Sequence, residues 1–163
     1  MVPIITYPDK RLTQKSEPVL SFGAEVARIA EKLEGALARS IAMGLSAPQL
    51  GINRRIIVVS SEESGPLVVV NPEISGARGV KVEDEGCLSL PGAYFKIPRP
   101  LRVVVTGRDA FGNEMRVDAA GYTARAFVHE IDHLDGMLLW DRLPPESRAA
   151  AVESFLAASP KTR

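Results

Sequence analysis

The 163-residue sequence contains one cysteine, Cys87, and two histidines, and these low numbers limit the chemistry that the chain can carry. A single cysteine excludes an intramolecular disulfide, and it also excludes a metal site closed by several thiolates. Cys87 is therefore a buried structural residue, a metal ligand or a nucleophile. By count alone the structural role is favoured, because free cysteines commonly pack as small apolar residues.

The sequence also lacks an excess of charge of either sign and a long apolar run. Lys+Arg and Asp+Glu number 20 each, so the net charge is +0 and gives no general attraction to DNA or to an anionic membrane. No stretch approaches the ~20 apolar residues of a membrane span, and the N-terminus lacks the basic and apolar regions of a signal peptide. We therefore expect a cytoplasmic protein with neither DNA nor membrane as a partner.

Composition and hydrophobic pattern predict one α+β domain over residues 1–163. Hydrophobic residues at 45% and charged residues at 25% are ordinary globular values. Helical and β-branched apolar patterns alternate with turn residues. The predicted elements are a helix over residues 22–39 with Ser21 as N-cap, a loop over 43–51, strands over 55–60, 67–71, 79–83, 101–108 and 114–118, a helix over 122–135 and a last helix from Pro144. This order favours mainly antiparallel sheets with an N-terminal and a C-terminal helix.

His129 and His133 lie four residues apart in the segment HEIDH, and they are the two histidines of the sequence. On a helix this spacing places both imidazoles on one face, where they can bind one metal ion. Glu130 is displaced by about 100° around the helix, within reach of a metal-bound water without being a ligand. The pattern also arises by chance with partly buried histidines, so the metal interpretation depends on a third ligand.

Cys87 is the candidate for that third ligand. A thiolate binds borderline divalent metals, and one cysteine with two histidines leaves the open fourth position that is typical of catalytic sites. A bound divalent ion lowers the pKa of water, and Glu130 is placed to act as general base. The side-chain amide of Gln49 and the backbone N–H of Leu88 are candidate donors to a developing oxyanion. Taken alone, however, a loop glutamine such as Gln49 is more often solvent-exposed.

Three segments in this order resemble the three signature motifs of the peptide deformylases: GLSAPQ (residues 44–49), EGCLS (85–89) and HEIDH (129–133). The opening at residues 7–9, the segment at 97–99 and the C-terminal helix are also similar to that family, so the resemblance covers essentially the whole chain. It implies an enzyme that removes the formyl group from the N-terminal formyl-methionine of nascent bacterial proteins and releases formate. It also implies antiparallel sheets packed around a central HExxH helix.

The resemblance further implies a role for each matching residue. Cys87, His129 and His133 would bind the metal, commonly Fe²⁺, with Zn²⁺, Ni²⁺ or Co²⁺ also able to occupy the site. Glu130 would be the general base and later the acid that protonates the departing amine. Gln49 and the N–H of Leu88 would polarise the formyl oxygen.

Other implied features concern the substrate and the partners. Gly44 would present its backbone to the bound peptide, and Glu85 would form an ion pair with Arg99 that supports the Cys87 segment. The candidates for the wall of an apolar methionine pocket are Met43, Tyr122 and Ala126. The expected partners are formyl-methionyl N-termini, with ribosome association and a monomeric state as family-level expectations.

The sequence departs from the usual family pattern at three positions. Ala42 replaces the first glycine of a loop that usually reads GxGLAAPQ, and Ser46 replaces its first alanine. The lost glycine restricts the loop if its backbone needs a positive φ. Val128 stands where glutamine is common, so we expect a buried polar group near the metal to be missing, a kind of change that alters affinity or rate by ~10–100-fold.

Three other hypotheses fit parts of the pattern. A zinc peptidase of the HExxH type would take its third ligand from a downstream carboxylate, namely Asp135, Asp141, Glu146 or Glu153. A cysteine hydrolase would use Cys87 with a histidine and would leave Glu130 without a role. A catalytically weakened paralogue would bind peptide N-termini without turnover.

Overall fold

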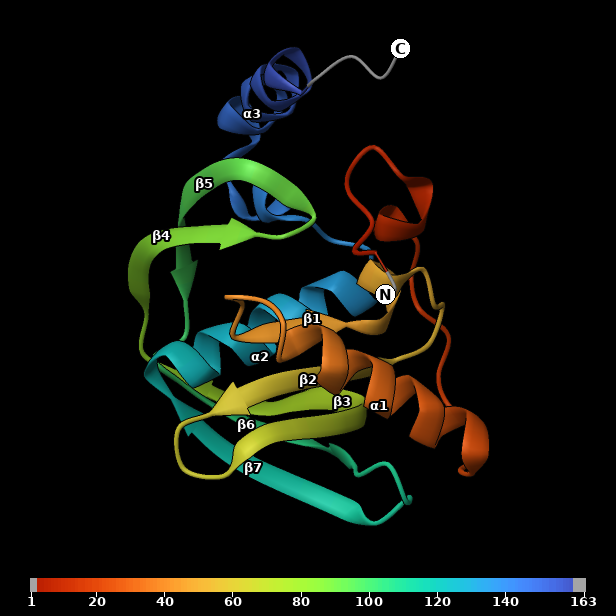
Figure 1. The fold of residues 1–163 in the computed structure, drawn as a ribbon. Helices are drawn as coiled ribbons and strands as arrows, with labels where there is room; N and C mark the ends of the chain where they lie inside the picture. Colours follow the sequence, from red (N-terminus) through yellow and green to blue (C-terminus); the bar gives the residue numbers. More distant parts are fainter. Residues whose placement is uncertain (1–2, 160–163) are drawn as a thin grey trace.

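Two antiparallel sheets and three α-helices make up the described part of the chain, residues 3–159 of a computed structural model (Figure 1). The larger sheet has the strand order β1-β2-β3-β6-β7 and the smaller one pairs β4 with β5. The strands are β1 (Gly44–Ser46), β2 (Ile56–Ser61), β3 (Gly65–Arg78), β4 (Lys81–Cys87), β5 (Leu90–Arg99), β6 (Arg102–Arg108) and β7 (Glu114–Ala120). The helices are α1 (Ala24–Leu37), α2 (Gly121–Leu134) and α3 (Pro145–Ala158), with 3-10 turns η1 (Lys10–Thr13), η2 (Ala47–Leu50) and η3 (Leu139–Arg142).

Helix α2 lies between the two sheets (Figure 1). On one side Phe127 packs in an apolar cluster with Ile57 of β2 and other residues of the five-stranded sheet. On the other side Arg125 and His129 bond to Glu85 of β4. The predicted α+β fold with a central HExxH helix is thus confirmed, and the helix ends lie within one residue of the prediction.

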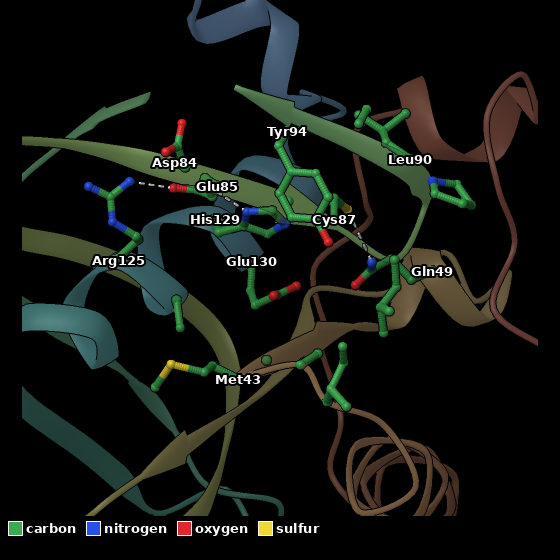
Figure 2. A pocket seen from close by; sticks show the side chains of 18 of the residues that line it. Met43, Gln49, Asp84, Glu85, Cys87, Leu90, Tyr94, Arg125, His129 and Glu130 are labelled. Carbon is green, nitrogen blue, oxygen red and sulfur yellow. Dashed lines mark hydrogen bonds and ion pairs between the residues drawn. The ribbon is translucent and has the colours of Figure 1, made fainter. Parts of the chain in front are cut away.

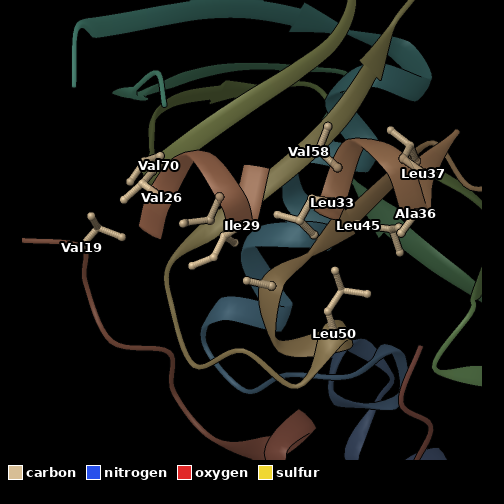
Figure 3. Close-up of a cluster of buried hydrophobic side chains, with 12 residues drawn as sticks. Val19, Val26, Ile29, Leu33, Ala36, Leu37, Leu45, Leu50, Val58 and Val70 are labelled. Atoms are coloured by element: carbon tan, nitrogen blue, oxygen red, sulfur yellow. The ribbon is translucent and has the colours of Figure 1, made fainter. Parts of the chain in front are cut away.

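Helix α1 packs its apolar face against β1, β2 and η2 (Figure 3). The five positions predicted for that face are all buried: Val26, Ile29, Ala30, Leu33 and Leu37. The helix begins at Ala24, and in the described part of the chain its N-cap is Gly23, without a side-chain hydrogen bond. The prediction of Ser21 as N-cap is therefore wrong, because the helix starts later than the apolar period suggested and glycine is tolerated at an N-cap.

All predicted strands are present, but strands β1 and β5 and the 3-10 turns were missed. Strand β5 contains Pro91, Gly92 and Pro98, residues that normally argue against a strand. The predicted loop over residues 43–51 holds β1, which pairs with β2, and then η2. These elements are short and rich in glycine and proline, so pairing with neighbouring strands, not local propensity, decides their structure.

The N-terminal arm, residues 4–9, connects two segments that are distant in sequence. The N–H of Ile5 donates to the carbonyl of Gln49 (2.9 Å), and the N–H of Tyr7 donates to the carbonyl of Ser89 (3.0 Å). Tyr7 also packs edge-on against Trp140 of η3. The N-terminal arm therefore fixes η2 and the β4–β5 turn relative to each other. Among residues 3–159, no helix has both the length and the apolar character that crossing a membrane requires.

Candidate active site

The three predicted ligands come from two distant parts of the sequence and meet in one cluster. Cys87 and His129 line a cavity (Figure 2). Cys87 ends β4, whereas His129 and His133 lie one turn apart on α2. The Sγ of Cys87 is 3.3 Å from Nε2 of His133, which is 3.2 Å from Nε2 of His129. Among the described residues, this is the one group of three cysteine, histidine or carboxylate side chains whose donor atoms all lie within 4.8 Å of one another.

This donor set fits a divalent transition metal. A tetrahedral ion with metal–nitrogen bonds of about 2.1 Å and metal–sulfur bonds of about 2.3 Å separates its donors by roughly 3.3–3.6 Å. Two of the three donor–donor distances, 3.2 and 3.3 Å, are close to that separation, and the third is within 4.8 Å. One thiolate and two imidazoles suit a borderline metal, and three donors leave a position for water or substrate.

Glu85 fixes the orientation and the protonation of His129. Its Oε1 lies 2.6 Å from Nδ1 of His129. Burial raises the pKa of Glu85, but the hydrogen bonds from His129 and Arg99 outweigh this effect and hold its pKa well below the ordinary value. The ionised carboxylate can only accept, so Nδ1 of His129 donates to it and Nε2 is the ring nitrogen that faces the cluster.

Two buried arginines hold Glu85 in place. The expected pair with Arg99 is confirmed, with Nη2 at 2.6 Å from Oε1 of Glu85. Arg125, which the sequence analysis did not single out, contacts Oε2 at the same distance, 2.6 Å, and also donates to the carbonyl of Ile97. Its position four residues before His129 was the available signal, because that spacing puts both on one face of α2.

The electrostatics of the cluster favour a cation. Burial raises the pKa of the Cys87 thiol, but His133 and His129 outweigh this effect and hold that pKa well below its ordinary value. Burial lowers the pKa of His129, yet hydrogen bonds to Cys87 and Glu85 hold it well above the usual range. Both shifts stabilise a thiolate beside positive charge, which is the arrangement that a divalent metal satisfies.

Glu130 is buried, lines the cavity, and lies beside Gly44. Among residues 3–159, its Oε2 has no hydrogen-bond partner. Burial raises the pKa of Glu130 to about 7, a value suited to taking up and releasing a proton near neutrality. A Cβ on Gly44 would lie 2.8 Å from both Cγ and Oε1 of Glu130, so the glycine provides the room that this carboxylate occupies.

The amide of Gln49 also points into the site (Figure 2). Gln49 is only 2% exposed, and its Nε2 lies 3.7 Å from Sγ of Cys87. A loop glutamine taken alone is more often exposed, but this side chain is buried because it contacts Ser46, Cys87 and Ser89. Leu88 follows Cys87 in the turn between β4 and β5 and lines the same cavity.

The cavity beside the cluster has a volume of about 360 Å³. All four predicted substrate-binding residues line it: Met43, Gly44, Tyr122 and Ala126. The rim also contains two large exposed side chains that the sequence analysis missed, Ile41 at 95% and Tyr94 at 69% exposure. Tyr94 lies on β5, the strand that escaped prediction, which explains why it was not recognised as part of the site.

The three departures from the family pattern do not disrupt this arrangement. Among the described residues, Asn71 is the one non-glycine with a positive φ, so Ala42 does not need the freedom of glycine. Val128 packs in the apolar cluster between α2 and the five-stranded sheet. Position 128 therefore faces an apolar layer and is not among the residues that line the cavity. Valine at this position removes no polar group from the cavity wall, contrary to the expectation from the sequence. Ser46 adds a buried hydroxyl that bonds to Gln49.

Comparison with known proteins identifies the family. The sequence model of the family described as Polypeptide deformylase matches residues 1–149. The chain belongs to the peptide deformylase family. It is 41% identical over 140 residues to the peptide deformylase of Desulforudis audaxviator, covering 85% of this chain and 91% of that one. It is 43% identical over 152 residues to the peptide deformylase of Thermomicrobium roseum, covering 88% and 86%.

Solved structures of the family share the fold. The crystal structure of a Thermus thermophilus peptide deformylase superposes with a TM-score of 0.89 at 39% identity, covering 96% of this chain and 94% of that one. The Ehrlichia chaffeensis peptide deformylase in complex with actinonin gives a TM-score of 0.90 at 33% identity and 99% coverage of both chains. The chain is therefore a metallohydrolase that removes the N-formyl group from nascent peptides.

The rival hypotheses fit less well. Cys87 is the third donor beside both histidines, whereas Asp135, a downstream candidate of the zinc-peptidase hypothesis, pairs with Arg55 at 2.8 Å. A cysteine hydrolase does not account for Glu130 in the cavity wall. The weakened paralogue is not favoured either, because the relatives and the structural neighbours are peptide deformylases.

Replacing Gly44 with alanine is expected to lower kcat for deformylation by about 100-fold, because a displacement of roughly 1 Å of a reacting group has an effect of that order. The new Cβ would overlap with the carboxylate of Glu130. The measurement is kcat at saturating formyl-peptide together with metal content. Gly23→Ala is the control, since nothing lies within 4 Å of a Cβ there. A parental kcat in Gly44→Ala would show that catalysis does not depend on the present position of the Glu130 carboxylate.

Proposed function

We propose that Cys87, His129 and His133 bind Fe²⁺ and that the neighbouring cavity holds the formyl-methionyl end of a nascent chain. The observation that carries this proposal is the convergence of the three donor atoms within 4.8 Å of one another beside the cavity that Glu130 and Gln49 line. Iron is proposed from the family resemblance, because a thiolate with two imidazoles also accommodates Zn²⁺, Ni²⁺ or Co²⁺.

Different residues of the chain then carry out different steps of the hydrolysis. The bound metal supplies Lewis-acid activation of water at neutral pH. Glu130 accepts a proton from the attacking water and returns it to the amine nitrogen as the C–N bond breaks, so that formate and a free N-terminus result. Gln49 Nε2 and the N–H of Leu88 donate to the formyl oxygen as its negative charge develops. The pKa of Glu130, raised to about 7 by burial, supports its double use.

The substrate side of the proposal rests on the cavity lining. Met43 and Ala126 give one wall an apolar surface, and the exposed ring of Tyr122 lies at the rim. An unbranched methionine side chain suits such a wall, because flexible apolar groups fill irregular pockets. Gly44, at the start of β1, is proposed to present its backbone to the peptide.

Four further properties are proposed from the family. The chain would act as a single domain over residues 1–163, which the continuous family match over residues 1–149 supports. It would work as a monomer in the cytoplasm and meet its substrates at the ribosome, where formylated N-termini first emerge.

The experiment that tests the proposal is formate release by iron-loaded protein kept free of oxygen. A formyl-Met peptide should release formate at least about tenfold more efficiently, in kcat/KM, than the same peptide with formyl-Asp, because a carboxylate loses solvation in an apolar pocket. Absence of formate from a fully metal-loaded protein would contradict the proposal. Equal efficiency for both peptides would contradict the assigned pocket wall.

The same assay distinguishes the metals. Prolonged exposure to air is expected to inactivate the iron-loaded protein, because Fe²⁺ is oxidised, and to leave zinc-loaded protein at its starting activity. Unchanged activity of the iron-loaded protein after air exposure would count against iron as the oxygen-sensitive metal of this site.

A further inference from the structure

We propose that Ser46 is a positioning residue that holds the amide of Gln49 in the orientation needed to donate to the formyl oxygen. Ser46 is fully buried at the end of β1, three residues before Gln49. Its backbone nitrogen lies 3.0 Å from Oε1 of Gln49, and its hydroxyl oxygen lies 3.1 Å from the same atom. The inference rests on the proposed role of Gln49 as an oxyanion donor.

The partners of the amide fix which end is oxygen and which is nitrogen. The backbone N–H of Ser46 can only donate, so the amide atom that it faces is the oxygen. The NH₂ group is therefore turned to the other side, 3.2 Å from the Ser89 hydroxyl and 3.7 Å from Sγ of Cys87. In the opposite orientation the amide oxygen would face the Cys87 thiolate and the NH₂ would face the Ser46 N–H.

A row of hydrogen bonds in one direction secures this orientation. The Ser46 hydroxyl donates to Gln49, Gln49 donates to Ser89, and the Ser89 hydroxyl donates to the carbonyl of Ile5 at 2.9 Å. The Ile5 carbonyl can only accept, so both ends of the row determine the direction of the bonds between them. Ser89 and Ile5 thus anchor the nitrogen end of the amide, and Ser46 anchors its oxygen end.

The Ser46 hydroxyl is a second hydrogen-bond donor to Oε1 of Gln49, beside the backbone N–H of the same residue. A second donor on Oε1 polarises the amide and strengthens the N–H bonds that it makes on the other side. Because the backbone N–H remains in a Ser46→Ala variant, the amide keeps one anchor and the expected effect is moderate. We expect kcat for deformylation to fall about three- to tenfold in Ser46→Ala, with KM and metal content unchanged.

A double-mutant cycle tests whether Ser46 acts through Gln49. Ser46→Ala, Gln49→Leu and the double variant are compared with the parent for kcat, KM and metal content. The proposal predicts that Ser46→Ala lowers kcat in the parent and has no further effect in the Gln49→Leu background. An equal loss in both backgrounds, or no loss in the parent, would overturn it.

A spectroscopic readout keeps the test independent of turnover. In zinc-loaded protein, the ¹⁵N side-chain resonance of Gln49, assigned by its disappearance in Gln49→Leu, should shift in Ser46→Ala. It should stay in place in Ser16→Ala, which removes a buried hydroxyl that has no partner among the described residues. If the Gln49 resonance did not move in Ser46→Ala, the positioning role would be refuted, whether or not the chain releases formate. If the resonance moved but the parent released no formate, the positioning role would stand and only the proposed function would be refuted.

Discussion

Glu130→Gln is expected to lower kcat for formate release by about 10³-fold, within the range of ~10²–10⁴ that general acid–base groups contribute. Glutamine has nearly the same shape but cannot accept the proton of the attacking water. The side chain lines the cavity and is not part of the three-donor cluster, so metal content should equal that of the parent. The measurement is single-turnover formate release from a formyl-Met peptide by protein of known metal content.

Glu153→Gln on α3 is the matched control, because it makes the same change at an exposed glutamate and should leave kcat unaltered. More than a tenth of the parental kcat in Glu130→Gln would show that another group accepts the proton. A loss of metal in this variant would instead point to Glu130 as a ligand.

Cys87→Ser is expected to weaken metal binding by more than about 100-fold, because changing a mere neighbour of a ligand already costs ~10–100-fold. The serine hydroxyl stays protonated near neutral pH and is a poor ligand, whereas the environment of Cys87 holds its pKa well below the ordinary value. The measurement is the metal content of the variant after dialysis against a weak chelator, followed by formate release.

Asp135→Asn is the corresponding control. Asp135 pairs with Arg55, so its neutral variant should keep the metal and the activity of the parent. If Cys87→Ser kept its metal and Asp135→Asn lost it, the downstream carboxylate of a zinc peptidase would be the third ligand and the assignment of Cys87 would be wrong.

The sequence was sufficient to predict the fold class and the three side chains of the donor cluster. The i, i+4 spacing of His129 and His133 determines their common face once the segment is a helix, and apolar periodicity predicts that helix. With a single cysteine in the chain, Cys87 was the one thiolate available as a third donor. These inferences depend on local periodicity and on chemistry, both of which are visible in a sequence.

The features that were missed depend on contacts between distant segments. Gln49 itself was predicted, but its burial was missed, because its side chain bonds to Ser89, 40 residues further along the chain. Arg125 looks like a surface cation of a helix until β4 and β5 supply Glu85 and a backbone carbonyl as partners. Strand β5 carries prolines and a glycine that argue against a strand, and its pairing with β4 overrides that propensity.

The bonds of the N-terminal arm have a practical consequence for anyone who attaches something to this protein. Because Ile5 and Tyr7 bond to the main chain at Gln49 and Ser89, the segment over residues 5–7 is part of the framework that carries the proposed oxyanion donor and the segment of Cys87. A bulky tag joined close to residue 5 would displace the segments of Gln49 and Cys87 together. The resulting loss of activity would resemble the loss of a catalytic residue. Helix α3, which projects from the rest of the fold, is the safer place for a fusion or an immobilisation handle (Figure 1).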